Sequence, residues 1–432
     1  MDDPPLASTL TGQATEIDNP DDILATVTQD ALTWIGSQSY FELPDKIQKK
    51  LATDYLAHYF SPWKDTHLLN TPDEIKEQTQ NTIDKLLKSP GFAANGRLHS
   101  KTWVEKIAAN ADLSTFPNLS KKAITIHDAD VRLLPTLEPT FTEWLSKNNG
   151  YPFDNLQNSL IAANTPIAVL HVSRDGAWYL IFSGACSGWI KSQDIAFVNR
   201  SYIKTWETHE YFAPSKSYLA AFVHTDLPPL NARIGNLYPI QHRLVKSYDI
   251  PIAVSNSNHR AVTKLLHVEK QQLNLFPLKL TLHNIALVAN ELLGNPYGWG
   301  GIYGFRDCSS TLMDLMAPFG IWLPRNSGEQ CRIGQVINLA DMADAEKESY
   351  IIHNAIPFLT LIHLPGHIAL YIGAENNQAY LLHAVWHFGG TVITPLNLKK
   401  KTSASLLTQV DSMTNLVDRD KLNYKKKVTI RP

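Results

Sequence analysis

Cysteine is scarce in this 432-residue chain, which contains only Cys186, Cys308 and Cys331. Three thiols cannot all pair within one chain, so the disulfide framework that stabilises many small secreted domains is not expected. The histidines show no spacing with cysteines or carboxylates that is typical of a metal site. We therefore expect neither a metal ion nor a cofactor.

The sequence also lacks an excess of charge and a long apolar run. Its 39 basic and 41 acidic residues nearly balance, so it has no electrostatic footprint for nucleic acid. No stretch of about twenty residues is uninterrupted by charged or polar residues, and no membrane span is expected. The polar start at residues 1–5 is not typical of a signal peptide.

The pattern of apolar residues changes along the chain, and 432 residues are too many for one ordinary core. Residues up to about 120 show helical spacing, with Thr71 as a candidate N-cap. Short β-runs separated by turns follow, a spacing typical of small barrels. The sequence therefore predicts a multi-domain α+β chain: a helical domain at 1–120, small β-barrels at 121–203 and 204–268, and an α+β domain at 269–432.

Cys308 opens a predicted helix directly after a glycine-rich, turn-forming stretch that begins at Asn295. Unpaired N–H groups and the positive end of the helix dipole at such a position favour a thiolate, which is the nucleophilic form. A lone cysteine is more often a small buried residue. We assign that role to Cys186, in a hydrophobic stretch, and to Cys331, toward which no histidine-bearing strand points.

Two histidines offer the base that Cys308 needs. His367 precedes an alternating apolar run at 368–373, and a second predicted strand ends at His383. If these strands pair antiparallel, residues placed symmetrically about the turn face one another. We predict Cys308 as nucleophile, His367 as the base that takes its proton, and His383 as the group that holds the useful tautomer of His367.

His387 is the residue most easily mistaken for this partner, because in an extended strand it would share a face with His383. The other histidines have no spacing that suggests chemistry, and we expect them to be packed or solvated. These are His267, His283, His353 and His363.

Four motifs surround the three predicted catalytic residues: Asn295-Pro-Tyr-Gly-Trp-Gly-Gly301, Asp307-Cys-Ser-Ser310, Leu323-Pro-Arg-Asn-Ser327 and Gly366-His-Ile-Ala-Leu-Tyr-Ile-Gly373. Together they resemble the NlpC/P60 family of cell-wall cysteine peptidases, over residues 282 to 394. The resemblance implies a compact papain-like fold in which the cysteine starts a helix packed on an antiparallel sheet that carries the histidines. One departure is Ser310, where the family commonly has glycine; serine is also small, so this should cost little.

The resemblance implies hydrolysis of peptidoglycan stem peptides, between D-glutamate linked through its γ-carboxyl and a diamino acid. In relatives with SH3-like modules, a free N-terminal L-alanine of the substrate is recognised by residues that match Tyr297, Asp307 and Ser309, and the Trp-Gly-Gly element falls at Trp299. A plain helix N-cap is an equally good interpretation of Asp307. A core position is the more common role for an aromatic residue such as Trp299.

Attack by Cys308 creates an oxyanion that needs hydrogen-bond donors. The backbone N–H of Cys308, at a helix start, is well placed to be one donor, and the sequence does not identify a second. Arg325 either binds a substrate carboxylate or fixes a loop, and we favour the loop.

Upstream segments resemble the other modules found in this subgroup of the family. Residues 132–135, 175–179 and 188–190 resemble a bacterial SH3 domain, and 204–268, with a strand expected at 218–223, resembles a second one. The segment at 59–63 resembles the N-terminal stabilising domain, which we expect to clamp the modules together.

The predicted function is that of a cysteine peptidase acting on peptidoglycan stem peptides or muropeptides, as a monomer, with the SH3-like modules shaping its cleft. A catalytically silent wall-binding protein is the alternative, and the intact Cys308, His367 and His383 argue against it. A permuted acyltransferase of related fold would have its histidine before its cysteine, which is not the order here. We expect the periplasm or cell envelope as its compartment, with recycling in the cytoplasm as the alternative.

Overall fold

The computed structural model describes residues 16–17, 24–35, 39–40, 43–64, 70–144, 150–207, 210–216, 232–270, 274–400, 405–422 and 425–426. The chain divides into two compact units. Unit 1 comprises Met1–Leu51, Pro277–Tyr297 and Arg306–Pro432, and unit 2 comprises Ala52–Phe276 and Gly298–Phe305. Among the described residues, no helix is long and apolar enough to cross a membrane.

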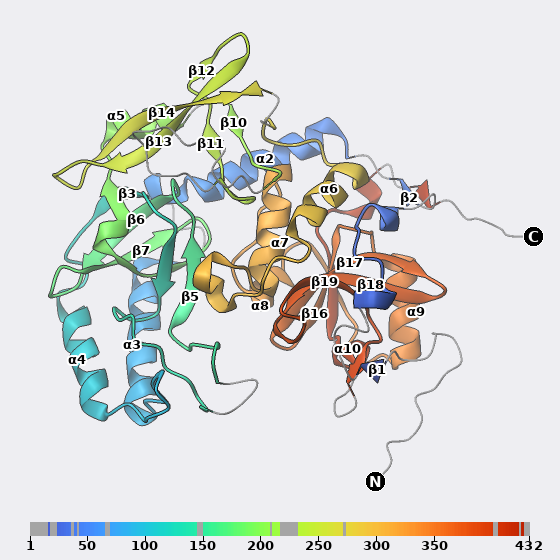
Figure 1. The fold of residues 1–432 in the computed structure, drawn as a ribbon, viewed down its shortest axis with the longest axis horizontal. Coiled ribbons are helices and arrows are strands. Elements are labelled where there is room, and N and C mark those ends of the chain that lie inside the picture. Colours follow the sequence, from blue (N-terminus) through green and yellow to red (C-terminus); the bar gives the residue numbers. More distant parts are fainter. Residues whose placement is uncertain are drawn as a thin grey trace, which may run out of the picture. The chain divides into compact units, whose positions relative to one another are not determined.

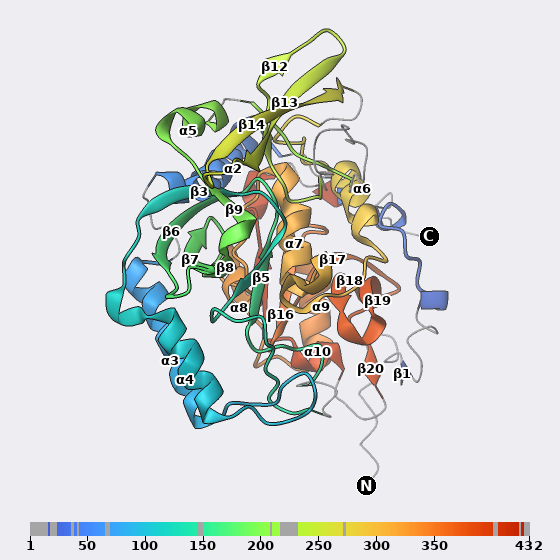
Figure 2. The same ribbon diagram turned by 60° about the vertical axis from the view of Figure 1, so that its left-hand side comes forward.

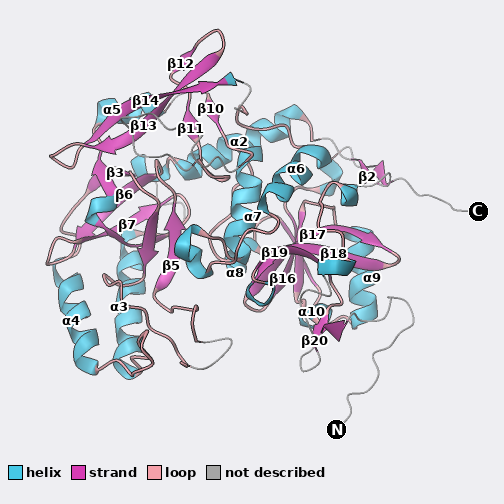
Figure 3. Ribbon diagram, in the orientation of Figure 1, coloured by secondary structure: helices cyan, strands magenta, loops and turns pink. Residues whose placement is uncertain are grey.

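Unit 2 is built on a seven-stranded antiparallel sheet with the order β5-β4-β8-β7-β6-β3-β9. Figure 3 labels β3, β5, β6 and β7 of this sheet. Its strands are β3 Lys121–Thr125, β4 Ala129–Arg132, β5 Gln157–Ile161, β6 Pro166–Val172, β7 Trp178–Ser183, β8 Ser187–Lys191 and β9 Ile195–Phe197. Apolar side chains alternate along these strands and form two buried clusters, one of which also receives the apolar faces of two helices.

These two helices, α3 Pro72–Lys88 and α4 Lys101–Ala111, lie side by side (Figures 1 and 2). The N-cap predicted for α3 is confirmed, because the Thr71 hydroxyl accepts from Glu74 N and a Glu74 carboxylate oxygen accepts from Thr71 N at 2.7 Å. This capping box satisfies two backbone donors that the helix leaves unpaired.

The region expected to form a second barrel contains α5 Arg200–Trp206 and two small sheets. β10 Tyr211–Phe212 pairs with β11 Tyr238–Pro239, while β13 Ser247–Ser255 lies between β12 His242–Arg243 and β14 Ala261–Glu269. The strand expected at 218–223 lies outside the described residues. The second barrel and the domain boundaries therefore stay predictions.

Unit 1 is built on a six-stranded antiparallel sheet with the order β15-β21-β16-β17-β18-β19. Its strands are β15 Gln335–Asn338, β16 Thr360–Leu364, β17 His367–Glu375, β18 Gln378–Val385, β19 Gly390–Pro395 and β21 Ser412–Asn415. Its helices are α6 Leu282–Leu292, α7 Cys308–Met316, α8 Ser327–Gln330, α9 Asp344–Asn354 and α10 Leu406–Gln409. Helix α7 packs on β17 and β18, and α6 packs on α7.

Helix α2, Asp45–Tyr59, contributes residues to both units. In unit 1 the Gln48 side chain donates to Leu278 O at 2.6 Å and accepts from Leu280 N at 3.2 Å. In unit 2 the Tyr59 hydroxyl donates to Asn164 O at 3.1 Å. The clamping role expected of the N-terminal segment stays a prediction.

The glycine-rich stretch before Cys308 belongs to unit 2, as the 3-10 element η6 Trp299–Gly304. Gly301 has φ +85°, and a Cβ there would lie 2.4 Å from Leu160 Cβ on β5. Gly300 O accepts from Gln157 Nε2 at 3.0 Å. Only glycine allows this combination of a left-handed backbone and close approach to a strand.

Candidate active site

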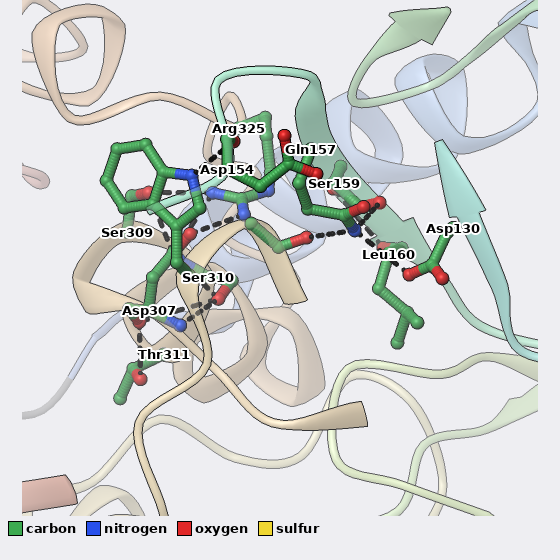
Figure 4. A network of polar contacts seen from close by, with 12 residues as sticks. Asp130, Asp154, Gln157, Ser159, Leu160, Asp307, Ser309, Ser310, Thr311 and Arg325 are labelled. Atoms are coloured by element: carbon green, nitrogen blue, oxygen red, sulfur yellow. Dashed lines mark hydrogen bonds and ion pairs between the residues drawn. The ribbon is translucent and has the colours of Figure 1, made fainter. Parts of the chain in front are cut away.

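Cys308 is the first residue of α7, and the helix start is held by the side chain of Asp307. Asp307 Oδ1 accepts from Ser310 N at 2.9 Å, and Ser310 Oγ accepts from Asp307 N at 2.9 Å, a reciprocal capping box (Figure 4). The predicted N-cap is therefore present. Ser310, which departs from the family pattern, contributes both its backbone N–H and its hydroxyl to this cap.

The Cys308 thiol is buried, and the backbone N–H groups of Ile368 and Ser309 act to lower its pKa. Burial nevertheless raises the pKa of the Cys308 thiol to about 12, with a smaller contribution from the nearby Asp307 carboxylate. The backbone N–H groups favour the thiolate, as expected at a helix start, but loss of solvation outweighs them.

Ile368 is the second residue of β17 and follows His367 directly, so the influence of its N–H on Cys308 shows that the start of β17 lies close to the start of α7. Strand β18, which pairs with β17, carries His383. A two-residue turn at Asn376 and Asn377, both with positive φ, joins these strands. The predicted antiparallel pairing is confirmed.

The sequence analysis expected His367 and His383 to lie symmetrically about this turn. In the structure they do not. A β-bulge shifts the register: Gly373 is opposite Tyr380, whereas Tyr371 is opposite Leu381. Because side chains alternate, an unshifted register would place His367 and His383 on opposite faces of the sheet. The bulge brings them to the same face as diagonal neighbours, and Gly373, at φ +148°, accommodates it.

A chain of hydrogen bonds crosses three strands from this point. His367 Nε2 lies 2.8 Å from His383 Nδ1, and His383 Nε2 lies 2.9 Å from Thr394 Oγ1 on β19. His383 and Thr394 are almost completely buried, at 1% and 0% exposure. Burial lowers the pKa of His367 to about 4, and that of His383 is also lowered. Both rings are therefore neutral in the resting protein.

This chain is compatible with a tautomer that makes His367 a base. If His383 Nε2–H donates to Thr394, then His383 Nδ1 must accept from His367 Nε2–H. The remaining nitrogen of His367, Nδ1, then carries a lone pair. It has no hydrogen-bond partner among the described residues, so it is available to the thiol proton.

A buried ion pair involves Asp307, the residue before Cys308. Arg325 Nη2 donates to Asp307 Oδ2 at 2.6 Å, and Nη1 donates to Asp307 Oδ1 at 3.1 Å and to Ser309 Oγ at 2.9 Å. Burial alone would raise the pKa of Asp307, but Arg325 and the Ser310 contacts hold it below its usual value. Of the two roles considered for Arg325, these contacts favour fixing the loop before α8.

The comparisons with known proteins agree with this geometry. Residues 294–402 match the model of the NlpC/P60 family. The chain therefore contains an NlpC/P60 family domain. Residues 8–116 match the N-terminal NLPC_P60 stabilising domain, and residues 139–191 match an SH3 domain of the SH3b1 type. The resemblance read from the motifs is confirmed.

Individual relatives show the same relationship. The gamma-D-glutamyl-L-lysine dipeptidyl-peptidase of Bacillus subtilis (strain 168) is 38% identical over 65 residues, which span 15% of this chain and only 22% of that protein. A solved NlpC/P60 endopeptidase from Photobacterium damselae subsp. piscicida is 27% identical, with TM-score 0.79, over 90% of this chain and 97% of that one. An NlpC/P60 family protein from Bacillus cereus ATCC 10987 has TM-score 0.51 at 16% identity, over 69% of this chain and all of that one, and shows the fold alone.

The predicted substrate residues of the NlpC/P60 domain fall into two groups. Tyr297, Asp307 and Ser309 belong to unit 1 with Cys308, and the nearby Cys308 and Asp307, together with burial, raise the pKa of Tyr297. Trp299 belongs to unit 2, where its Nε1 donates to Asp154 O at 3.0 Å and its ring contacts Phe153. The contacts of Trp299 are those of a structural aromatic, and its substrate role stays a prediction.

Sequence reasoning missed two residues that support the NlpC/P60 site. Thr394 ends the histidine chain, and Gln330 donates from Nε2 to Ser309 O at 2.9 Å and to Pro324 O at 2.8 Å, tying α8 to the start of α7. No local pattern marks either residue, although Thr394 follows an apolar β-run beside the predicted histidine strand. His387, the alternative partner, is exposed in the 3-10 turn η8 Trp386–Phe388. Among the described residues, no group of histidine, cysteine, aspartate and glutamate could hold a metal ion.

Proposed function

We propose that the chain is a cysteine peptidase that hydrolyses the γ-D-glutamyl–diamino acid bond of peptidoglycan stem peptides bearing a free N-terminal L-alanine. The observation that carries this proposal is the hydrogen-bonded chain from His367 through His383 to Thr394, beside a buried thiol at a helix start. The name of the Bacillus subtilis relative, which specifies a γ-D-glutamyl bond and dipeptide release, supports the choice of bond.

The proposed reaction begins with a neutral pair. His367 Nδ1 takes the Cys308 proton as the sulfur attacks the carbonyl carbon, so the thiolate exists only during attack. The backbone N–H of Cys308, which has no hydrogen-bond partner among the described residues, is aimed from the helix start and stabilises the oxyanion. The tetrahedral intermediate then collapses, its C–N bond breaks, and the imidazolium of His367 protonates the departing amine.

A thioester between Cys308 and the D-glutamyl γ-carbonyl remains after this first half. Water attacks the thioester while His367 takes the water proton, and the sulfur leaves as the thiol when that proton returns to it. During each transfer the positive charge on His367 is shared with His383, whose Nε2–H requires Thr394 as an acceptor. His367, His383 and Thr394 thus together stabilise the proton that His367 takes up.

In this proposal Tyr297, Asp307 and Ser309 contact the L-alanyl end of the substrate. Arg325 already neutralises the Asp307 carboxylate, so the charge of Asp307 is not wholly available to a substrate ammonium. Asp307 therefore serves two purposes, holding the start of α7 and sharing its carboxylate with the amine. Trp299 stays a predicted substrate contact.

The experiment uses L-Ala-γ-D-Glu-meso-diaminopimelate and mass spectrometry of its products. Wild-type protein should release L-Ala-D-Glu, and Cys308→Ala should reduce the rate by at least about 10³-fold because its nucleophile is gone. Cys331→Ala is the matched control and should stay within about twofold. Hydrolysis by Cys308→Ala at the wild-type rate would sink the mechanism.

A second substrate separates end recognition from catalysis. Acetylating the N-terminal alanine removes the ammonium, so turnover should fall at least about tenfold if the amine is bound by charge-assisted hydrogen bonds. Equal rates would refute amine recognition while leaving the catalytic assignment intact. If neither peptide is cleaved but the protein binds peptidoglycan, the alternative of a silent wall-binding protein is correct.

A further inference from the structure

A concavity of about 640 Å³ in unit 2 is surrounded by basic side chains. Its walls come from the end of the 3-10 turn η2 Ser61–Trp63, from β3 and β9, and from α5. The basic residues that line it are Lys64, Lys121, Lys122, Arg200 and Lys204. Nothing in the proposed peptidase reaction uses this site.

The walls of this basic concavity are braced against one another. Trp63 Nε1 donates to Ala123 O at 2.8 Å on β3, and the Trp63 ring packs edge-on against Trp206 of α5 with centroids 6.2 Å apart. Val198 N donates to Lys122 O at 3.0 Å, joining the end of β9 to β3. The cations therefore project from rigid elements, which is the arrangement that a preformed binding site requires.

The charged side chains that line the concavity are mostly basic. The acidic residue in its lining is Glu207, which lies 4.0 Å from Lys64, and the Lys122 ammonium donates to Trp63 O. Lys121 lies over the Phe197 ring at 4.7 Å. In the part of the chain that the structure describes, no carboxylate pairs with Lys121, Arg200 or Lys204.

The excess of basic residues around the concavity contrasts with the formal net charge of the whole chain, which is -2. Gathering like charges around one hollow is unfavourable without a counter-anion, and such a hollow concentrates anions from solution. An arginine and two lysines suit phosphate, because phosphate carries up to two negative charges and offers three acceptor oxygens, whereas a carboxylate carries one charge.

The volume and the apolar lining of the concavity further restrict the class of ligand that it suits. A volume of about 640 Å³ is within the range of sites for organic molecules rather than for a single small ion. Val198 and Ile203 provide partly buried apolar surface, and no large exposed hydrophobic residue belongs to the lining, so nothing is offered for insertion into a bilayer. We propose that this concavity binds a soluble organic phosphate that carries more than one negative charge.

Isothermal titration calorimetry on the full chain tests this proposal with glucose 1,6-bisphosphate as probe and citrate as a carboxylate of comparable charge. The bisphosphate should bind at least about tenfold more tightly than citrate, and the difference should survive an increase in salt from about 50 to about 200 mM. Vesicles containing phosphatidylglycerol form a third arm, because a lipid headgroup presents the same phosphate chemistry on a surface.

The paired substitution Arg200→Gln with Lys204→Gln should weaken binding of the bisphosphate at least about tenfold, through loss of two charge-assisted contacts. The matched control is Lys246→Gln with Lys264→Gln, two exposed lysines of unit 2 outside the concavity, and it should stay within about twofold. Melting curves check the fold, and Lys121→Gln replaces the pair if the pair melts early. The proposal is overturned by equal binding of citrate, by equal loss in the control, by preference for vesicles, or by no binding of the bisphosphate.

Discussion

Unit 1 contains two polar networks, one that includes the predicted base His367 and one that includes Asp307 next to Cys308, and they differ in charge. In the first, His367, His383 and Thr394 form a chain of neutral groups with contacts of 2.8 and 2.9 Å. In the second, Asp307 and Arg325 form a bidentate ion pair with contacts of 2.6 and 3.1 Å. His383, Thr394, Asp307 and Arg325 are buried and His367 is half-buried, yet only the second network carries charge at rest.

The difference follows from what each network must do. A permanent ion pair holds geometry, because each partner supplies the countercharge that burial would otherwise make costly. A proton carrier must change charge during the reaction, so its resting state is neutral and its charged state depends on neighbours that can accept a hydrogen bond. The helix start is thus held by charge, while the chemistry is left to groups that titrate.

The largest effect should come from breaking the neutral network at its reacting end. His367→Gln removes the base, so kcat should fall about 10²- to 10⁴-fold, as expected for loss of general base catalysis. The matched control is His387→Gln, an exposed histidine that should leave kcat within about twofold. Steady-state kinetics with the L-Ala-γ-D-Glu peptide measures both. Similar losses in the two variants would contradict the assignment of His367.

Breaking the charged network should act on stability. Arg325→Leu leaves the buried Asp307 carboxylate without its countercharge, and we expect a loss of about 3–5 kcal/mol in the free energy of unfolding. Urea denaturation measures this, with the exposed Arg332→Leu as the control, expected within about 0.5 kcal/mol. Adding Asp307→Asn to Arg325→Leu should recover part of the loss. If it does not, the pair does not act as an ionic clamp.

Acid should distinguish the networks without any substitution. Burial lowers the pKa of His367 to about 4, whereas an unfolded histidine titrates near about 6.5, so the unfolded chain binds the proton first as pH falls. The stabilisation that a neutral His367 allows is complete above about pH 6.5 and is lost progressively down to about pH 4.

Wild-type protein should therefore lose about 2 kcal/mol more than His367→Gln between pH 8 and pH 4.5 in urea denaturation. Protonation of other groups lowers the free energy of unfolding of both proteins equally, so the difference between them reports on His367. Equal acid sensitivity in the two proteins would mean that His367 is not held neutral by burial.

The smallest effect should come from the far end of the neutral network. Thr394→Val keeps the shape but removes the acceptor for His383 Nε2–H, so the His367 imidazolium is less stable and kcat should fall about tenfold. The acid limb of the pH profile of kcat/KM should also move to lower pH, which a purely structural change would not cause. Thr394→Ser should restore both.

Thr391→Val is the matched control, a buried threonine on the same strand. It should leave kcat within about twofold and the acid limb unmoved. A shift of the same size in Thr391→Val would assign the effect of Thr394→Val to packing rather than to the hydrogen bond.

Local patterns were enough to predict the elements that carry the site. The turn-rich stretch before Cys308, the cap at Asp307 and the alternating run after His367 are signals within a few residues of one another, and each element they predicted is present. Thr71 as the cap of α3 was predicted on the same basis. Such signals depend on backbone geometry that a short segment determines for itself.

The tertiary structure alone decided how these elements meet. A one-residue bulge between Tyr371 and Gly373 determines whether the two histidines share a face, and a local pattern of alternation does not show which register two strands will adopt. The elevated pKa of the Cys308 thiol depends on how completely neighbouring elements exclude water. Thr394 lies 11 residues after His383, and Arg325 lies 18 residues after Asp307, so each contact depends on how separate elements pack. The sequence by itself determined which residues can react, and long-range packing determined their protonation states and partners, because solvation and strand register are properties of the assembled fold.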